Sequence, residues 1–261
     1  MSGYRRRMCG RFSATTQPSL LAKRFQAQLV AGEGYQPSWN VAPSTDVLVV
    51  AASDEGARQL RALRWGLVPK WAKDLSAGNR LINLRSETVR DKPTWRRLLA
   101  RHRGLLPIDG FYEWQNLGKG RGKQPFYITA RDGQPLALAV LWDTWHDKGK
   151  DGDGEQQVET CTILTTTPNE LLSSIHDRMP VIIPPERWDT WLDPDNTDVD
   201  ALSGLLVAAP EDLLALWPVD PSVGNTRNNH PDLTRPLEGH EGRTGGEAPG
   251  AEGSGGKGDS G

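Results

Sequence analysis

The chain has 261 residues, of which 36% are hydrophobic and 25% charged, as in ordinary globular proteins with room for one substantial domain or two small ones. No stretch approaches the roughly 18 consecutive apolar residues of a membrane helix, and no apolar segment follows the arginine-rich start as it would in a secretory signal. The net charge is −2, but residues 143–159 carry −4 and residues 238–261 carry −3, so the remainder carries +5, which is compatible with a polyanionic ligand without establishing one.

In chain order, the hydrophobic pattern predicts a few helices among many strands. Two segments have apolar residues at the spacing of an amphipathic helix, namely Leu21, Phe25 and Leu29, and then Trp95, Leu98, Leu99 and His102. A further helix is expected at Thr167-Pro168-Asn169-Glu170, which has the pattern of a capping box with proline at the first helical position. Short β-branched, aromatic or apolar runs bounded by turn residues predict strands at Asp46–Ala52, Phe126–Ala130, Leu136–Trp142 and Glu159–Thr166.

Two polar segments are expected to lie outside the packed elements. The segment His146–Gln157 is glycine-rich between two apolar runs and predicts a long exposed hairpin loop. The last segment, Glu238–Gly261, has no large apolar residue and cannot offset its ordering entropy, so it is predicted to be disordered. Strands separated by turns, with occasional helices, indicate an α+β fold, mostly antiparallel β, with a barrel-like core and flanking helices.

The chain has two cysteines, Cys9 and Cys161, and their separation favours free thiols in a reducing compartment. Each can be a small buried hydrophobe. If Met8 is the true initiator and is removed, Cys9 carries both a thiol and an α-amine, whose pKa of about 7.7–8.0 leaves it substantially unprotonated near neutral pH. An amine and a thiol on adjacent carbons can trap an aldehyde, first as an imine and then as a thiazolidine.

Tryptophans and arginines lie close together in Trp65–Trp71 and Ile82–Thr88. Indoles can stack on unpaired bases while guanidinium groups hold phosphates; the alternative is that Trp65 and Trp71 are core aromatics. Asn83 stands in an apolar run and needs hydrogen-bond partners if it is buried, in a structural role or to orient a reacting group.

Two further segments carry candidate proton-transfer groups. Glu113 stands among aromatic residues, where desolvation would raise its pKa toward a range useful for moving protons, although it can also be an ordinary strand carboxylate. His176 and Arg178 would share a face of an extended backbone, and a lone histidine is more often structural. The sequence has no CxxC, no HExxH and no acidic pair at ligand spacing, so we expect no metal and no cofactor.

Taken together, seven motifs occur in the order found in the SOS response-associated peptidase family, also called the abasic site processing proteins. They are Cys9-Gly10-Arg11-Phe12, Asn40-Val41-Ala42-Pro43, Trp65-Gly66-Leu67 with Pro69, Asn83-Leu84-Arg85-Ser86-Glu87-Thr88, Asp109-Gly110-Phe111-Tyr112-Glu113-Trp114, His176-Asp177-Arg178-Met179-Pro180 and Val223-Gly224-Asn225. The chain resembles this family from Met8 to about Leu237. The resemblance implies a compact, mostly β domain with flanking helices and a basic cleft, here a single domain over residues 8–237.

The resemblance also implies catalytic roles for four residues. Cys9 is similar to the N-terminal nucleophile that forms a thiazolidine with the ring-opened sugar of an abasic site. Asn83 is similar to an asparagine that hydrogen-bonds near the linkage, and Glu113 to a glutamate that moves protons during imine formation. His176 is similar to a histidine that assists opening of the sugar ring and reversal of the link.

Four more residues resemble the DNA-binding positions of the family. Arg11, Arg85 and Arg178 are expected at DNA phosphates, and Trp71 is expected to stack near the lesion. The implied partner is single-stranded DNA that contains abasic sites, with the replication machinery as a further candidate partner. We expect a monomer without membrane contact, located in the cytoplasm and associated with the nucleoid after damage.

One feature departs from the family, because residues 1–7 precede Met8. The family's cysteine directly follows the initiator methionine, and an internal Cys9 would have no free α-amine. We expect either a start at Met8, which we favour, or removal of a leader, including self-cleavage by Cys9. Two other interpretations stay open: a cysteine peptidase with Cys9 and His176 as nucleophile and base, and a non-covalent single-stranded DNA-binding module.

Overall fold

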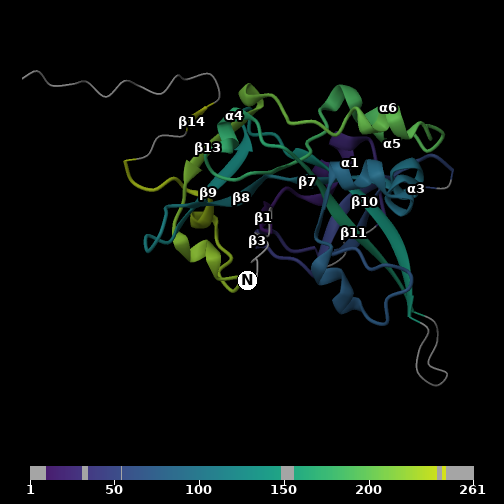
Figure 1. Cartoon of the computed structure of the whole chain (residues 1–261), viewed down its shortest axis with the longest axis horizontal. Helices are drawn as coiled ribbons and strands as arrows, with labels where there is room; N and C mark the ends of the chain where they lie inside the picture. The colour runs from purple at the N-terminus through teal and green to yellow at the C-terminus, as the bar shows by residue number, and fades with distance from the viewer. Residues whose placement is uncertain (1–9, 31–34, 54, 148–155, 240–242, 245–261) are drawn as a thin grey trace, which may run out of the picture.

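The computed structural model describes residues 10–30, 35–53, 55–147, 156–239 and 243–244 (Figure 1). Its strands are β1 (Phe12–Ala14), β2 (Gln28–Leu29), β3 (Ser38–Val41), β4 (Asp46–Ala52), β5 (Arg58–Trp65), β6 (Asn83–Arg85), β7 (Arg103–Ile108), β8 (Gly110–Asn116), β9 (Lys123–Ala130), β10 (Leu136–Asp147), β11 (Gln156–Thr166), β12 (Met179–Pro180), β13 (Leu214–Pro218) and β14 (Arg243–Thr244). Its α-helices are α1 (Pro18–Phe25), α2 (Ser86–Asp91), α3 (Pro93–Arg101), α4 (Glu170–Ser173), α5 (Trp188–Leu192) and α6 (Val199–Ser203). None of these helices is long and apolar enough to cross a membrane.

Five strands close into a barrel. β11 pairs with β10, β10 with β7, β7 with β4 and β4 with β5, all antiparallel. The parallel pairing of β5 with β11, in which Trp65 lies opposite Cys161, completes the ring. Closure pairs the strands on both sides and leaves no exposed sheet edge along the ring. The predicted α+β class, mostly antiparallel with a barrel-like core and flanking helices, is confirmed.

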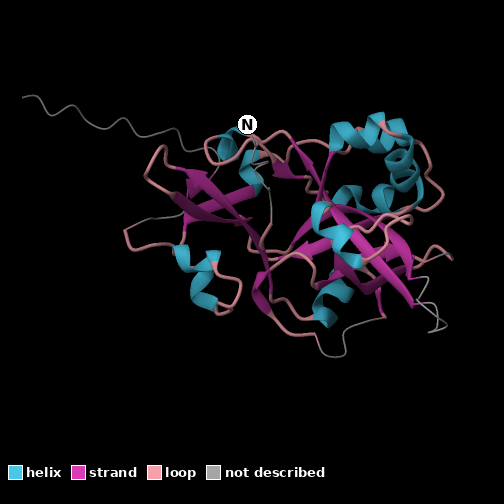
Figure 2. Ribbon diagram, turned by 60° about the horizontal axis from the view of Figure 1, so that its bottom comes forward, coloured by secondary structure: helices cyan, strands magenta, loops and turns pink. Residues whose placement is uncertain are grey.

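The barrel has an apolar interior and an apolar outer face, because side chains alternate along each strand. In β4, Val47 belongs to the interior cluster and its neighbour Leu48 to the outer one. The outer cluster is covered by helices, which Figure 2 shows gathered on one side of the barrel. There Phe25 of α1 stacks on Trp188 of α5, with ring centroids 4.2 Å apart.

A second sheet lies beside the barrel, with the strand order β14-β13-β9-β8-β1-β3 (Figure 1). One of its faces packs into the barrel core through Phe12 and Phe111, which are directly paired. The opposite face carries Tyr112 and Tyr127, whose rings are 5.1 Å apart in a smaller apolar cluster. This sheet carries Glu113 on β8, and Arg11 lies directly before its strand β1.

Most predicted elements are present in the structure. The strand predicted at Asp46–Ala52 coincides with β4, and the other three predicted strands lie within β9, β10 and β11. The second predicted helix is α3. β10 and β11 pair as far as Asp147 and Gln156, so the predicted hairpin is confirmed and its loop is shorter than expected, with residues 148–155 outside the described part.

Three predictions were wrong in detail. Gln26 takes the left-handed conformation (φ 52°) and ends α1, so Leu29 lies exposed in β2 instead of on the helix. The cap of α4 is Asn169, whose side chain accepts a backbone N–H three residues on, and not Thr167. Arg243–Thr244, inside the segment predicted to be disordered, pairs with β13; residues 1–7 and 245–261 lie outside the described residues.

Candidate functional site

Glu113 lies in the middle of β8 and is only 2% exposed. Its neighbours explain the burial, because Tyr112 packs into the tyrosine cluster and Phe111 into the barrel core. Since side chains alternate along a strand, Glu113 points to the same side of the sheet as Phe111. The carboxylate is therefore buried on the face of the sheet that packs toward the barrel core.

β1 carries the start of the described chain to Glu113. The backbone N–H of Tyr112 donates to the carbonyl of Arg11 over 2.9 Å, and Phe12 pairs with Phe111. Continuing this antiparallel register by one residue places Gly10 opposite Glu113. Cys9, the predicted nucleophile, lies outside the described residues.

Arg11 is half-buried and joins a hydrogen-bond hub centred on Asn40. Its Nη1 donates to Asn40 Oδ1 (2.9 Å) and to the Val223 carbonyl (3.0 Å), and burial lowers the pKa of the guanidinium. Asn40 Nδ2 lies 2.8–3.2 Å from the carbonyls of Val223, Asn225 and Asn228. Three motifs that are far apart in sequence thus meet in one place, and these contacts use only one terminal nitrogen of Arg11.

Asn83 opens β6, a short strand that pairs in parallel with β11, where Asn83 lies opposite Ile163. The preceding carbonyl, that of Ile82, accepts the N–H of Ile163 (3.0 Å) and the indole N–H of Trp65 (2.9 Å). Trp65 in turn packs against Phe12, with ring centroids 5.0 Å apart. One buried side chain therefore links the Asn83 segment to β1.

His176 lies in the bend between α4 and β12 and is 8% exposed. Its Nδ1 accepts the backbone N–H of Arg178 (3.2 Å) and lies 2.9 Å from a carboxylate oxygen of Asp177. Ile175 and Met179, on either side, are buried in the barrel core. These contacts orient the ring through Nδ1, so proton transfer at this residue would use Nε2.

Arg178 is 7% exposed and its guanidinium is engaged inside the protein. Nη1 and Nη2 donate to the two carboxylate oxygens of Glu87 over 2.5 and 2.8 Å, and Nη2 also donates to the carbonyl of Thr165 over 2.6 Å. The hydrogen bonds from Arg178 hold the pKa of Glu87 below its usual value. This Glu87–Arg178 clamp favours a structural role for Arg178, and its contact with DNA stays a prediction.

The three candidate catalytic residues in the described chain, Asn83, Glu113 and His176, lie on segments that contact one another. The clamp ties the His176 bend to the start of α2, directly after the strand of Asn83. On the other side, Gln115 Nε2 donates to the Ser174 carbonyl in the same bend (3.0 Å), and Gln115 shares its face of β8 with Glu113. A buried carboxylate, an imidazole and an amide held in this way can bind a polar group and move protons to and from it.

Trp71 is 83% exposed, whereas Trp65 is wholly buried. The core alternative therefore holds for Trp65, and Trp71 is free to stack on a ligand. The turn that carries Trp71 is anchored to the barrel, because the indole N–H of Trp145 donates to the carbonyl of Ala72 over 2.9 Å. The exposed indole of Trp71 therefore stands on a turn that is hydrogen-bonded to the barrel.

Two glycines, Gly66 and Gly78, lie close together in the loop between β5 and β6 that carries Trp71 (the Trp71 loop). Gly66 has a φ of +126°, a value that favours glycine, and a Cβ atom on Gly78 would lie 2.3 Å from the Gly66 carbonyl oxygen. The two backbones can approach this closely only without side chains. The approach fixes where the chain leaves β5 and where it returns toward β6.

Exposed basic side chains follow Trp71 along the chain as far as the end of β6. Arg85 is exposed at the end of β6, and sequence reasoning missed two other exposed residues of this region, Lys73 and Arg80. It also missed the roles of Glu87 and Asn40, although both stand inside motifs that the sequence presents. Only the partners across the fold reveal what these two residues do.

The second cysteine is excluded as a nucleophile. Cys161 is fully buried in the barrel core, and burial raises the pKa of its thiol, so it stays protonated and inaccessible. Among the residues that the structure describes, no group of three or more His, Cys, Asp or Glu side chains could hold a metal ion.

The fold and the candidate site define an α+β barrel protein in which the segments that carry Glu113, His176 and Asn83 contact one another. Residues 8–226 match the family described as SOS response associated peptidase (SRAP). The abasic site processing protein YoqW of Bacillus subtilis is 40% identical over 234 residues, which cover 89% of this chain and all of that protein. The abasic site processing protein YedK of Escherichia coli is 31% identical over 238 residues, covering 88% and 100%.

A solved structure supports the fold. A crystal structure of a protein from Bacteroides thetaiotaomicron superposes with a TM-score of 0.76 at 24% sequence identity and covers 88% of this chain and all of its own. The chain belongs to the SOS response associated peptidase family.

Proposed function

We propose that this protein processes abasic sites in single-stranded DNA by forming a covalent bond through Cys9 as the terminal residue. The observation that carries the proposal is the register of β1 on β8. Continued past Arg11, this register brings the residue after Cys9 opposite the buried carboxylate of Glu113. Membership of the family and the names of its relatives agree with it. The same family match begins at Met8, where removal of one methionine would expose the amine of Cys9.

The proposed chemistry uses two groups of one residue. The α-amine of Cys9 attacks the aldehyde carbon of the opened sugar, and the resulting carbinolamine loses water to give an imine. The thiol sulfur then adds to the imine carbon while the nitrogen takes up a proton, which closes a thiazolidine. The net product is protein plus DNA less one water, and Glu113 and His176 are the groups proposed to give and take the protons.

The exposed surface next to this cluster suits a single strand. Trp71 offers an indole for base stacking, and Arg85 offers a guanidinium to a phosphate. Asn83 is proposed to hydrogen-bond near the linkage, and Arg11 to reach a phosphate with the nitrogen that the Asn40 hub does not use. Such binding should weaken with salt.

The intact mass of the protein after mixing with an oligonucleotide that carries one abasic site tests the proposal. A chain that begins at Met8 and the full chain go through the same assay, with an undamaged oligonucleotide and Cys9→Ala as controls. We expect a species at protein plus DNA less one water, with Cys9 as its first residue. A Met8 chain with a free Cys9 terminus that stays unlinked would refute the proposal.

Three further measurements separate the alternatives. Loss of residues 1–8 from the full chain, absent in Cys9→Ala, would support self-cleavage of the leader. Turnover of an added peptide that depends on Cys9 and His176 would favour the peptidase interpretation. Salt-dependent binding without any covalent product would favour a plain single-stranded DNA-binding module.

A further inference from the structure

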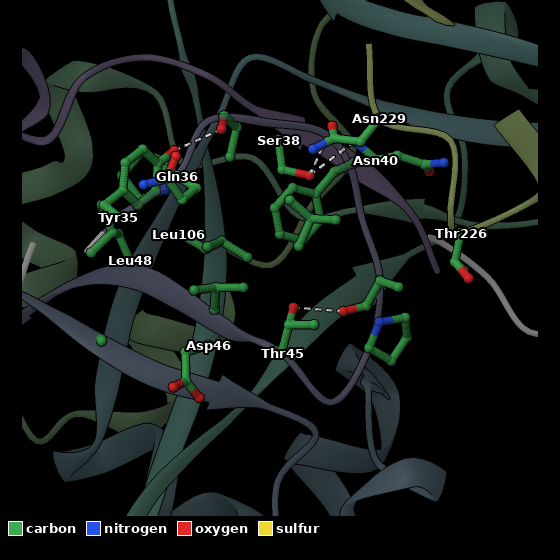
Figure 3. Close-up of a pocket in the computed structure, with 18 of the residues that line it drawn as sticks. Tyr35, Gln36, Ser38, Asn40, Thr45, Asp46, Leu48, Leu106, Thr226 and Asn229 are labelled. Atoms are coloured by element: carbon green, nitrogen blue, oxygen red, sulfur yellow. Dashed lines mark hydrogen bonds between the residues drawn. The ribbon is translucent and has the colours of Figure 1, made fainter.

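A cleft of about 780 Å³ opens between the edge strand β3, strand β1 and the first residues of β4 (Figure 3). Its volume lies within the range of about 300–1,000 Å³ that is typical of small-molecule sites. The half-buried residues Ala14, Val41 and Pro43 contribute apolar wall, and Tyr35 contributes an aromatic ring held in place by a 2.6 Å hydrogen bond from its hydroxyl to the Ala14 carbonyl. The apolar walls suit a flat, largely apolar ligand.

The cleft opens on the same side of the sheet as the buried carboxylate. Phe12 and Ala14 line the cleft, and Phe12 is paired with Phe111, so both share a face with Glu113. At about 3.3 Å per residue, two to four residues of β1 separate Gly10, opposite Glu113, from these lining residues. A nucleotide next to one held beside Glu113 is therefore within reach of the cleft.

The lining excludes a charged phosphate. None of the residues that line the cleft is a lysine, arginine or histidine, and the one charged residue is Asp46, which is exposed. An anion would find no countercharge there and would face a carboxylate. The ligand is therefore uncharged, and any phosphate attached to it stays outside.

Polar groups at the rim match the edge of such a ligand. The Oδ1 atom of Asn229 accepts the backbone N–H of Trp39 over 2.8 Å, which turns its Nδ2 donors away from that contact. Gln36 adds an exposed amide on another side of the cleft. Amides beside apolar and aromatic walls are the means by which proteins hold unstacked bases, through hydrogen bonds at the base edge and stacking on its face.

We propose that the cleft binds one nucleobase of the single strand, the base of a nucleotide that neighbours the abasic site. The inference rests on the proposed function, since that function brings the strand to Glu113. It assigns to the protein a preference for the base next to the lesion, with the sugar-phosphate chain running outside the cleft toward Trp71 and Arg85.

Fluorescence anisotropy with strands that contain a tetrahydrofuran abasic analogue tests the proposal without any covalent step. Two matched strands carry the same analogue and in addition lack the base of one neighbouring nucleotide, on the 5′ side in one strand and on the 3′ side in the other. Ala62→Trp places an indole at the mouth of the cleft, and Ala57→Trp is the matched control, because both alanines are exposed in the β4–β5 hairpin and only Ala62 lines the cleft. Thr226→Trp, on another side of the mouth, is a second blocking variant should Ala62→Trp fail to fold.

We expect wild type and Ala57→Trp to bind about tenfold less tightly when one particular neighbour loses its base, and the blocking variants to show no such difference. Equal affinity of wild type for all strands, or an unchanged difference in the blocking variants, would overturn the proposal. Cross-linking of the wild type to a true abasic site is measured in parallel. A cross-link without any base effect would refute only the cleft, and a base effect without a cross-link would refute only the covalent function.

Discussion

Glu87→Gln keeps the size of the side chain but removes the charge that the Arg178 guanidinium faces. The side chain of Arg178 is 8% exposed and that of Glu87 54% exposed, so water can replace the lost carboxylate only from one side. Breaking a fully buried ion pair costs about 3–5 kcal/mol, and a hydrogen bond to a charged group contributes about 1.5–3 kcal/mol. Because Glu87 is partly screened by solvent, we expect the free energy of unfolding to fall by about 2 kcal/mol, with Tm lower by about 4–8 °C.

The pH dependence of this loss follows from the pKa of Glu87. Hydrogen bonds from Arg178 lower that pKa in the folded state, whereas a glutamate in the unfolded chain has a pKa of about 4.3. The stabilisation by the clamp is therefore fully present above the unfolded value and is lost as the pH falls through the lowered folded value. The difference in stability between wild type and Glu87→Gln should persist from about pH 8 to about pH 5 and shrink below about pH 4.

Urea denaturation of both proteins over this pH range measures the difference. Glu186→Gln is the matched control, because Glu186 is an exposed glutamate in the short 3-10 helix Pro185–Arg187. The control should alter the free energy of unfolding by less than about 0.5 kcal/mol. If Glu87→Gln is as stable as the control, or if its deficit is the same at every pH, the clamp does not hold the fold together.

Three further outcomes are expected. Trp71→Ala should weaken single-stranded DNA binding by about 1–3 kcal/mol in a titration, with little change in the free energy of unfolding in urea. Trp65→Ala should lower the free energy of unfolding by about 3–5 kcal/mol. The reverse pattern would contradict the assignment of Trp71 to the surface and Trp65 to the core. Arg85→Ala should lower the slope of log affinity against log salt by about 0.7, and an unchanged slope would mean that Arg85 contacts no phosphate. Gly78→Ala should lower Tm, because its Cβ meets the Gly66 carbonyl, and a wild-type Tm would show that the loop base is not tight.

The sequence by itself determined the local structure and the class of fold. β4 begins and ends where its apolar run does, and α3 follows its helical spacing, since periodicity and turn residues act over a few positions. The sequence predicted the ends of helices less well, because several neighbouring residues could cap or end the same helix. Asn169 caps α4 in place of Thr167, and the left-handed Gln26 ends α1 before Leu29.

The sequence also supplied the candidate residues but not their partners. It singled out Glu113 for proton transfer and Arg178 for binding DNA, and only the tertiary structure shows that the Arg178 guanidinium is hydrogen-bonded to Glu87. It offered Trp65 and Trp71 as alternatives between core and surface, and the closure of the barrel decided that Trp65 is core and Trp71 is exposed.

The physical reason is the range over which each effect acts. Secondary structure depends on neighbours a few positions apart, whereas a buried charge or amide must find its partners wherever the fold provides them. Arg11 finds them in Asn40, 29 positions away, and in Val223, 212 positions away. No pattern within a single stretch of sequence carries such pairings, so the hub, the clamp and the cleft beside β1 exist only once the barrel and the second sheet have come together.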